Sequence, residues 1–559
     1  MEQQPEQQPT TQTAPPLSRK RIKPSSAQPL YFGMVLIVGI LIGTYLADSN
    51  LLTIKTGAEE NPNKLVSLID FIEENYVDSV DKRQLIDGAI QSILSHLDPH
   101  SYYISPEEIA QANEKIQGEY QGVGMEFMIY KDTLRVVKTM KDGPAEKAGL
   151  LTGDKVIKVD NKALTEKELA NDQVQKLIKG KAGTSVTLSI LRGKESKEIK
   201  IKRGSIPLKS VTAEFVIAPQ VGYVKVESFG QNTFNEFEQA VRKLRAQTCK
   251  TLIVDLRGNG GGLLDQSFLM AESFLPKDKL VLYTEGMHVG KKQYITQKDG
   301  EFKDMKVVVL VDQNSASASE IFAGALQDWD KSTTVGRRTF GKGLVQHEIE
   351  LPDRSAFRLT IARYYTPTGR CIQKPYSDST QYSDDFTSRY LHGELFNSDS
   401  IQKVDTLKFI TPGGKVVYGS GGITPEVFVP LDTSNVFVIN QLIMSGVMRD
   451  FCFEYFTNNQ KFLKGFANEK SFIDEFKVTE AMLTTMQSRL KKEWPTMKTK
   501  DWNKAKGDIR ARIKGTIGRY LFDDNTLEKV MFKNDRELLK AIEVATQEVP
   551  AAVPPKKRK

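Results

Sequence analysis

Residues 307–320 read Val-Val-Val-Leu-Val-Asp-Gln-Asn-Ser-Ala-Ser-Ala-Ser-Glu and change character halfway along. The unbroken apolar run at 307–311 is typical of a strand that is buried on both faces. Beyond this stretch, apolar side chains recur at helical spacing, at Ile321, Phe322, Ala325, Leu326 and Trp329. Ser317 is therefore expected at or near the N-terminus of a helix, where the first backbone amides lack intrahelical partners.

This position of Ser317 has two interpretations. Free amides at a helix N-terminus favour developing negative charge, so the amide of Ala318 could donate to the oxyanion of a tetrahedral intermediate. The same pattern also fits a Ser-rich helix cap without any catalytic role.

Lys342 stands twenty-five residues after Ser317, in Phe-Gly-Lys-Gly-Leu-Val-Gln at 340–346. A buried neutral lysine is one of the few bases able to activate a serine hydroxyl, so the pair favours a serine–lysine peptidase.

A second strand-turn-helix pattern contains a run of glycines. The apolar stretch 251–256 is followed by Arg-Gly-Asn-Gly-Gly-Gly at 257–262 and then by apolar residues at helical spacing. Glycines in this position supply exposed amides, and they also fit a tight turn or a phosphate cradle. A phosphate loop would end in Gly-Lys-Ser or Gly-Lys-Thr, whereas this chain has Gly-Leu-Leu. Nucleotide binding is not favoured.

Three segments carry a family resemblance: Asp-Leu-Arg-Gly-Asn-Gly-Gly-Gly at 255–262, Ser-Ala-Ser-Ala-Ser-Glu at 315–320 and Thr-Phe-Gly-Lys-Gly-Leu-Val-Gln at 339–346. They resemble the signature segments of the carboxy-terminal processing peptidases, also called tail-specific proteases, of serine peptidase family S41. The similarity extends upstream through Leu-Asp-Pro-His-Ser at 97–101 and Gly-Glu-Tyr-Gln-Gly-Val-Gly at 118–124, and it covers roughly residues 60 to 430.

The resemblance implies an α/β fold with a ClpP/crotonase-like core and no cofactor. By it, Ser317 is the nucleophile, Lys342 the general base and Gln346 the group that orients the lysine amine. The oxyanion hole would be formed by the amides of Ala318 and of a glycine in the 260–262 run, among which Gly262 is favoured. Asp328 matches an aspartate implicated in some members of the family, although on a helix face it could equally be a solvated carboxylate.

A histidine base and a metal site are the alternatives to the serine–lysine pair. The chain has five histidines, and His347 is the nearest candidate base for Ser317. Residues 346–351 alternate as a strand does, so Gln346 and His347 should point to opposite faces, and a Ser-His-Asp triad is not favoured. No His-Glu-x-x-His motif occurs, and His96 and His100 do not lie in a metal-ligand cluster.

Residues 118–207 resemble a PDZ domain inserted ahead of the core. A strand is expected from 122, a small helix at 143–150, and a tight turn followed by a strand at 153–160. Such a module captures a peptide C-terminus by strand addition, and the amides of a glycine-rich loop bind the terminal carboxylate. Here the loop would be Gly122, Val123, Gly124 and Met125. A helix with Val174, Leu177 and Ile178 would form the other wall, although any of these three could be core.

The N-terminal region predicts a membrane anchor. Residues 30–47 contain no charge over eighteen positions, which is long enough to span a bilayer core. Basic residues at 19–23 favour a cytoplasmic N-terminus. A cleaved signal peptide is the alternative. Its cleavage site would need a small residue two positions before Ala47, and Tyr45 occupies that position. The expected location is the bacterial inner membrane, crossed once, with the catalytic domain in the periplasm.

Charge and cysteine content exclude other classes of protein. Of the net charge of +8, residues 1–27 contribute +2 and residues 556–559 contribute +4, so the remainder of the chain is nearly neutral. A nucleic-acid partner is therefore poorly supported, and the basic terminus is most simply a solvated tail. The three cysteines are widely spaced and form neither a disulfide framework nor a catalytic thiol motif.

The expected organisation runs from a disordered cytoplasmic segment at 1–27 through a transmembrane signal anchor at 28–48 to an N-terminal helical segment at 60–117. A PDZ domain at 118–207, a peptidase core at 208–430, a C-terminal helical extension at 431–545 and a basic tail at 546–559 follow. Amphipathic stretches are expected at 434–458 and 477–494. The sequence indicates no function for this extension.

Three functions are compatible with these patterns. The first is an anchored serine endopeptidase that acts on protein or peptide substrates with free C-termini. The second is a non-catalytic PDZ adaptor on a protease-like fold, which the intact Ser317, Lys342 and Gln346 argue against. The third is an acyl-transferring enzyme of the crotonase type, which the PDZ-like insertion and the anchor do not favour. Homo-oligomers or an adaptor protein are possible partners.

Overall fold

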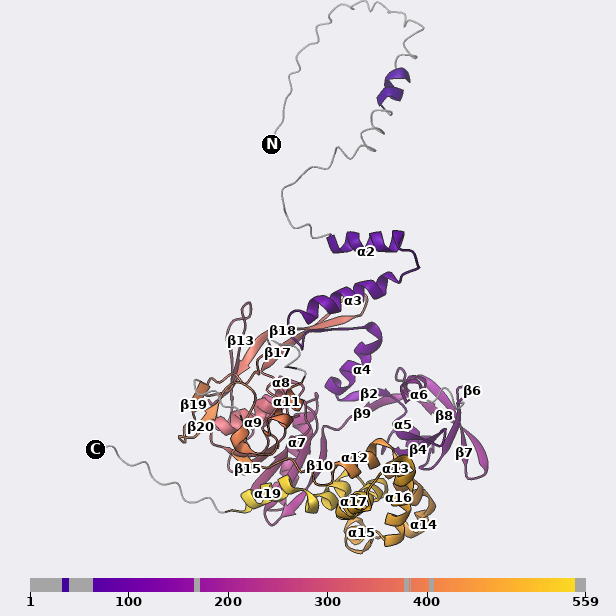
Figure 1. Cartoon of the computed structure of the whole chain (residues 1–559), viewed down its shortest axis with the longest axis vertical. Coiled ribbons are helices and arrows are strands. Elements are labelled where there is room, and N and C mark those ends of the chain that lie inside the picture. Colours follow the sequence, from indigo (N-terminus) through magenta and orange to yellow (C-terminus); the bar gives the residue numbers. More distant parts are fainter. Residues whose placement is uncertain are drawn as a thin grey trace, which may run out of the picture. The chain divides into compact units, whose positions relative to one another are not determined.

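The computed structural model describes residues 33–39, 64–164, 171–376, 382, 384–401 and 407–547 (Figure 1). The chain divides into two compact units, 1–86 and 87–559. Two helices, α2 (Lys64–Asn75) and α3 (Lys82–Ser95), lie within the helical segment predicted at 60–117. Of the anchor predicted at 28–48, only 33–39 are described, and these residues are helical and exposed; the remainder lies outside the described residues.

Among the described residues, no single helix has both the length and the apolar character needed to cross a membrane. One pair of helices, Val436–Met444 and Val447–Asn458, passes the same criteria of length and composition together, but the pair is bent by 63° at its break.

The largest part of the second unit is built on a six-stranded sheet in the order β10-β11-β12-β15-β16-β21. Its strands are β10 (Val211–Ala218), β11 (Val221–Val226), β12 (Thr251–Asp255), β15 (Lys306–Val311), β16 (Ser332–Gly336) and β21 (Val427–Phe428). Only the first pair is antiparallel. Because the carboxyl ends of parallel strands meet at one edge, the loops after β12, β15 and β16 lie at the same edge of the sheet.

Helices cover both faces of this sheet. Val307, Val309 and Val311 of β15 join a core with α7 (Thr233–Ala246), α8 (Leu264–Glu272) and α9 (Ala318–Asp328). Val308 and Leu310 join a second core on the opposite face with α19 (Arg536–Thr546). Burial on both faces explains the unbroken apolar run of β15. The predicted strands at 251–256 and 307–311 and the α/β fold class are confirmed.

A second, antiparallel sheet adjoins this layer and contains the strand predicted from the alternation at 346–351. Its order is β1-β18-β13-β14, and β17 also pairs with β18. The strands are β1 (Tyr102–Ile104), β13 (Leu280–Glu285), β14 (Lys292–Ile295), β17 (Leu344–Glu350) and β18 (Ala356–Tyr365). Smaller elements complete this region: α4 (Pro106–Gln117), α11 (Asp385–Leu391), η2 (Ser398–Ser400), β19 (Lys408–Ile410) and β20 (Val416–Tyr418).

The PDZ-like module has its own core and begins and ends in a two-stranded ribbon of β2 (Glu119–Gly122) and β9 (Gly204–Pro207). Its sheet has the order β3-β4-β5-β7-β8, with β6 paired to β5. The strands are β3 (Met125–Tyr130), β4 (Thr133–Thr139), β5 (Lys155–Val159), β6 (Lys162–Ala163), β7 (Ser185–Arg192) and β8 (Glu195–Lys202). The predicted small helix is α5 (Pro144–Lys147), and α6 (Asn171–Ile178) is the helix predicted beside the groove.

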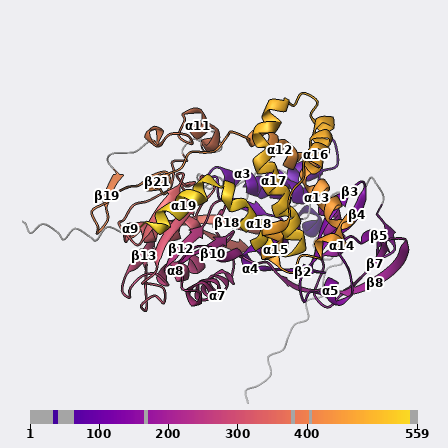
Figure 2. The ribbon, with the colours of Figure 1, turned by 90° about the horizontal axis from the view of Figure 1, so that it is seen from below.

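The last part of the chain is helical, as predicted, and we call α12 to α19 the helical module. Its helices are α12 (Val436–Met444), α13 (Val447–Asn458), α14 (Gln460–Leu463), α15 (Glu469–Glu475), α16 (Glu480–Glu493), α17 (Thr499–Leu521), α18 (Asp524–Met531), η4 (Phe532–Asn534) and α19. The stretch predicted at 434–458 is two helices, because Gly446 adopts a left-handed conformation with φ 73°. The longest described helix, α17, lies within the predicted extension but outside the two amphipathic stretches expected there. Figure 2 shows the module beside the PDZ-like strands β3 and β4.

Candidate active site

Ser317 is the N-cap of α9, at the end of the loop that follows β15. Its backbone has φ 55° and ψ −115°, a conformation that costs a residue with a Cβ free energy. A serine held on such a strained strand-to-helix turn projects its hydroxyl from the turn. The carboxylate of Asp312 shapes this loop by accepting hydrogen bonds from the amides of Asn314 at 3.0 Å and Ser315 at 3.1 Å. The predicted place of Ser317 at a helix N-terminus is therefore confirmed.

The glycine run lies against the nucleophile turn. A Cβ added to Gly261 would lie 2.8 Å from Ser317 Cβ and 2.9 Å from the amide nitrogen of Ala318, so only glycine fits there. The amide of Gly261 donates to Asn259 Oδ1 at 2.8 Å. Among the described contacts, the amides of Gly260, Gly262 and Ala318 have no acceptor. These three amides are the candidates for an oxyanion hole, and the predicted pair of Gly262 and Ala318 is among them.

Lys342 enters the site from the loop between β16 and β17. Its Nζ donates to Gln346 Oε1 at 2.8 Å, and Gln346 Nε2 in turn donates to the backbone carbonyl of His100. Burial lowers the pKa of Lys342, and the nearby Arg358 guanidinium lowers it further, while Asp98 and Glu320 act in the opposite direction. A larger fraction of this amine is therefore neutral at a given pH than in a free lysine.

Glu320 connects the loop of the nucleophile to the loop of the lysine. Its buried carboxylate accepts hydrogen bonds from the amides of Ser317 at 2.9 Å, Gly341 at 2.8 Å and Lys342 at 2.8 Å. The hydroxyl of Thr339 also donates to it. The predictions did not include Glu320, although Ser317-Ala-Ser-Glu320 has the spacing of a capping box.

Tyr364 of β18 makes a second connection between the same two residues. Its hydroxyl lies 3.0 Å from the carbonyl oxygen of Ser317 and 2.9 Å from that of Lys342. Complete burial raises the pKa of Tyr364 well above the usual value, so the hydroxyl remains a hydrogen-bond donor. No motif in the sequence indicated this residue.

His100 belongs to a turn that holds Gln346 in place. Asp98 accepts from the amides of His100 at 2.8 Å and Ser101 at 3.0 Å, and from the Thr360 hydroxyl of β18 at 3.1 Å. The turn thereby presents the His100 carbonyl to Gln346. Burial, aided by the positive charge of Lys342, lowers the pKa of the His100 imidazole to about 4, so the ring is neutral near pH 7.

Several of these groups line one cavity of about 780 Å³. Its wall includes Gly260, Gly262, Ser317, Lys342, Gln346 and Tyr364. His347 is exposed and does not line the cavity, as the strand alternation predicted. The roles assigned to Ser317, Lys342 and Gln346 remain predictions, because the amine of Lys342 bonds to Gln346 and the described contacts include no bond from it to Ser317.

Asp328 is buried and paired with an arginine. Its side chain and that of Arg370 are both 0% exposed and form an ion pair at 2.7 Å. Asp328 also accepts from the amide and the hydroxyl of Thr368, at 3.0 and 2.7 Å. The expectation of a solvated carboxylate is wrong, since a buried aspartate is stable only when paired. It does not line the cavity around Ser317.

A separate groove of about 460 Å³ runs between β3 and α6 of the PDZ-like module. Val123, Gly124, Met125 and Phe127 line one side, and Gln175 and Ile178 line the other. Gly122 lies in β2, paired with Gly204 of β9, and is not part of this lining. Val174 is core, so α6 presents Gln175 rather than Val174 to the groove. Lys179, which also lines the groove, pairs with Glu114 of α4 at 2.6 Å.

Within the described part of the chain, no group of three or more His, Cys, Asp or Glu side chains could hold a metal ion. The cavity around Ser317 instead provides a hydroxyl, an amine of lowered pKa and free backbone amides. This set of groups is suited to acyl transfer.

Family models match four parts of the chain. Peptidase family S41 matches residues 220–380, and the PDZ domain matches 122–202. The N-terminal domain of the activating protease CtpB matches 47–108, and a family of unknown function (DUF8443) matches 438–523. The last match falls within the helical module.

Several curated proteins are similar over most of their length. A probable CtpA-like serine protease of Staphylococcus haemolyticus is 37% identical over 364 residues, which cover 64% of this chain and 72% of that protein. A probable CtpA-like serine protease of Staphylococcus epidermidis is 37% identical over 344 residues, which cover 61% of this chain and 69% of that protein.

Solved structures also match. The photosystem II D1 C-terminal processing protease is 24% identical and covers 66% of this chain and 92% of its own, with a TM-score of 0.35. The PDZ domain of a carboxy-terminal protease from Vibrio cholerae, solved with a peptide, is 28% identical and covers 16% of this chain and 99% of its own, with a TM-score of 0.15.

The curated relatives decide the assignment, because their identity exceeds 30% over more than two thirds of their own length. The matched S41 segment contains the glycine run, the nucleophile turn and the lysine loop that surround the cavity. The chain therefore belongs to the CtpA-like serine peptidases of family S41 and carries a PDZ domain ahead of its peptidase core.

Proposed function

We propose that this protein is an endopeptidase that cleaves with Ser317 as nucleophile and Lys342 as general base. The observation that carries the proposal is the amine of Lys342, which has a lowered pKa and lines the same cavity as the strained Ser317 turn. A neutral amine donates one N–H to Gln346 Oε1 and keeps its lone pair for the proton of a serine hydroxyl.

The reaction follows from these groups. Ser317 Oγ attacks the scissile carbonyl carbon while its proton passes to Lys342 Nζ, and the oxyanion is stabilised by the amides of Ala318 and Gly262. The ammonium of Lys342 then protonates the departing amine as the C–N bond breaks, which leaves an acyl-enzyme. Water, deprotonated by the neutral lysine, attacks the ester and releases the acid and the free serine.

The PDZ groove would select the substrate by its C-terminal tail. An extended tail adds to the edge strand β3, and its last side chain enters the groove between β3 and α6. The loop with Val123, Gly124 and Met125 supplies the carboxylate site. A substrate with a free, apolar C-terminus is therefore preferred, and amidation of that terminus weakens cleavage.

The anchor predicted at 28–48 would hold the peptidase at the bacterial inner membrane, with the PDZ domain and the core in the periplasm. The support is the uncharged stretch at 30–47 and the basic flank at 19–23. Protease added to intact spheroplasts should digest the peptidase core. A core that is protected until the cells are lysed would contradict this topology.

One assay separates the three candidate functions. The full chain in detergent is incubated with an unfolded protein that has either a free or an amidated C-terminus, and fragments are analysed by mass spectrometry. The proposal predicts fragments, fewer from the amidated form, and none with Ser317→Ala. Binding of the tail without fragments would favour the adaptor, whereas turnover of an acyl thioester without proteolysis would favour the crotonase-type enzyme.

A further inference from the structure

The helical module contacts the peptidase core at the edge of the sheet where the active-site loops lie. Its last helix, α19, packs Leu538, Ala541 and Ala545 against the sheet face that contains Val308 and Leu310. The N-terminus of α19 carries two acids, Asp535 at the N-cap and Glu537 in the first turn. These acids point at Arg257, in the segment that leads into the glycine run.

Arg257 is the residue that receives these acids. It lies two residues after the end of β12 and precedes Gly258, at the start of the run that ends with Gly262. Its guanidinium pairs with Asp255 at 2.6 Å, with Asp535 at 2.8 Å and with Glu537 at 3.1 Å. The Arg257 side chain is 18% exposed, and a guanidinium so little hydrated is fixed by its partners.

Glu537 extends the same network to the other two active-site loops. It also pairs with Arg337, which directly follows β16. Arg337 Nε donates to Gln313 Oε1 at 2.8 Å, in the loop that leads to Ser317. That loop is connected back to the glycine run, because Asp312 accepts from the amide of Gly258 at 3.0 Å. One acidic helix turn thus connects the ends of β12, β15 and β16.

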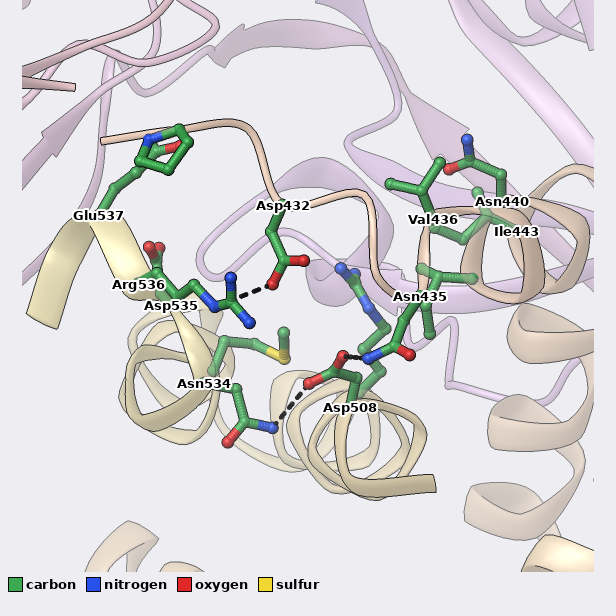
Figure 3. A pocket seen from close by; sticks show the side chains of 14 residues that line it. Asp432, Asn435, Val436, Asn440, Ile443, Asp508, Asn534, Asp535, Arg536 and Glu537 are labelled. Carbon is green, nitrogen blue, oxygen red and sulfur yellow. Dashed lines mark hydrogen bonds and ion pairs between the residues drawn. The ribbon is translucent and has the colours of Figure 1, made fainter. Parts of the chain in front are cut away.

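The start of α19 is itself held by α17 and by the segment that leads into α12 (Figure 3). Arg536 pairs with Asp432 at 3.2 Å, and Asp508 of α17 accepts from Asn435 at 2.7 Å and from Asn534 at 3.1 Å. These contacts surround a cavity of about 300 Å³ and fix the direction in which Asp535 and Glu537 are presented.

The module also contacts the PDZ domain at its peptide-binding edge strand. Arg519 of α17 forms a two-point ion pair with Glu126 of β3, at 2.9 and 3.1 Å. Phe453 and Tyr520 pack on Met128 and Tyr130, which lie on the outer face of the same strand. One module therefore contacts both the strand to which a substrate tail would add and the loop that would stabilise the oxyanion.

We propose that the helical module sets the geometry of the oxyanion hole, and that Asp535 and Glu537 are its positioning residues, acting through Arg257. The inference rests on the proposed peptidase function. The acids touch no reacting atom; they hold the guanidinium that precedes the glycine run, and thereby the direction of the Gly262 amide. Weakening them should slow the chemical step more than it weakens substrate binding.

The test uses the full chain with three substitutions. Asp535→Asn keeps an N-cap oxygen for the amide of Leu538 but removes a charge from Arg257. Glu537→Gln removes the charge shared with Arg337. Lys306→Gln is the control, since Lys306 Nζ donates to the carbonyl of Val544 of α19 at 2.7 Å across the same interface but at the start of β15, away from the loops. For each variant, kcat and KM on an unstructured peptide and Ki for a peptide boronic acid are measured.

We expect Asp535→Asn and Glu537→Gln to lower kcat about tenfold, with KM within about twofold, because a displaced oxyanion donor acts only in the transition state. The boronic acid, which forms a tetrahedral adduct with the serine, should bind about tenfold more weakly. Lys306→Gln should match the wild type in all three quantities.

Other results have definite meanings. Wild-type kcat and boronate affinity in both acid variants, with a cleaving wild type, would overturn the inference and leave the proposed function intact. Equal losses in Lys306→Gln would assign the effect to general loosening of the interface and would also overturn it. A wild type that cleaves no peptide would instead contradict the proposed function.

Discussion

At the scale of single residues, the protonation of Lys342 is set by opposing surroundings. Burial and the Arg358 guanidinium both disfavour the ammonium, while the carboxylates of Asp98 and Glu320 favour it, and the net effect is a lowered pKa. A base that must be neutral to act gains from this balance, because activity then begins at a lower pH than for a free lysine.

The first prediction concerns pH. kcat/KM should rise with pH as Lys342 loses its proton, with the midpoint below the value of about 10.4 for a free lysine. Arg358→Gln removes a positive charge that lowers the pKa, so the midpoint should move to higher pH. A rate profile from pH 6 to pH 10 measures both; a midpoint that does not move in the variant would contradict the account of Lys342.

The second prediction concerns Glu320. A glutamine has one acceptor oxygen in place of two, so Glu320→Gln leaves some of the amides of Ser317, Gly341 and Lys342 without their acceptor. Unfolding in urea should show a loss of about 1–3 kcal/mol, the cost of buried unsatisfied groups, together with a fall in kcat. The exposed Glu350 on β17 offers the control, and Glu350→Gln should change neither quantity.

At the scale of elements, α9 is fixed at both ends. Its N-terminus is held by Glu320, and near its C-terminus Asp328 is held by Arg370 and Thr368. The position of Ser317 is therefore determined by a helix that cannot shift along its axis without breaking buried contacts.

The third prediction follows from this second anchor. Asp328→Ala leaves the buried Arg370 without its carboxylate and should cost about 3–5 kcal/mol of unfolding free energy. The folded fraction should keep its KM, because Asp328 does not line the cavity around Ser317. A folded, stable variant with no activity would give Asp328 a direct part in catalysis instead.

The elements that could be predicted are those whose signals are local. The strand at 307–311, the helix after Ser317 and the alternation of Gln346 and His347 all follow from side-chain periodicity. Periodicity fails where a single backbone angle decides, as at Gly446, which divides one predicted stretch into two helices. Periodicity also does not show which face of a helix borders a groove. Val174, on the helix beside the PDZ groove, is buried in the core, and Gln175 lines the groove.

At the scale of the whole molecule, the contacts that complete the site join distant parts of the sequence. The Gln346 side chain bonds to the His100 carbonyl, and Arg257 pairs with Asp535. No spacing rule indicates such contacts, because they depend on how separate elements pack. The signature segments contain Ser317, Lys342 and Gln346, whereas no motif indicated Tyr364 or Asp535.

The fourth prediction tests the helical module as part of the fold. A chain that ends at residue 534 lacks α19 and leaves the face of the sheet with Ile253, Val308 and Leu310 uncovered. Such a protein should aggregate or melt at a lower temperature, because a large apolar face is exposed. A chain that ends at residue 547 keeps every described contact of α19 and should have the melting temperature and solubility of the full protein. Equal melting temperatures and solubilities of the two truncated chains would contradict this role of α19.

The central claim, that Ser317 and Lys342 act as one catalytic unit, is tested most directly by a double-mutant comparison. kcat/KM on an unstructured protein is measured for the wild type, Ser317→Ala, Lys342→Ala and the double variant, with circular dichroism as the control for folding. We predict that each single substitution abolishes cleavage and that the double variant is scarcely worse than either. A folded Lys342→Ala enzyme within about tenfold of the wild type, roughly 1.4 kcal/mol of barrier, would contradict the assignment of the base.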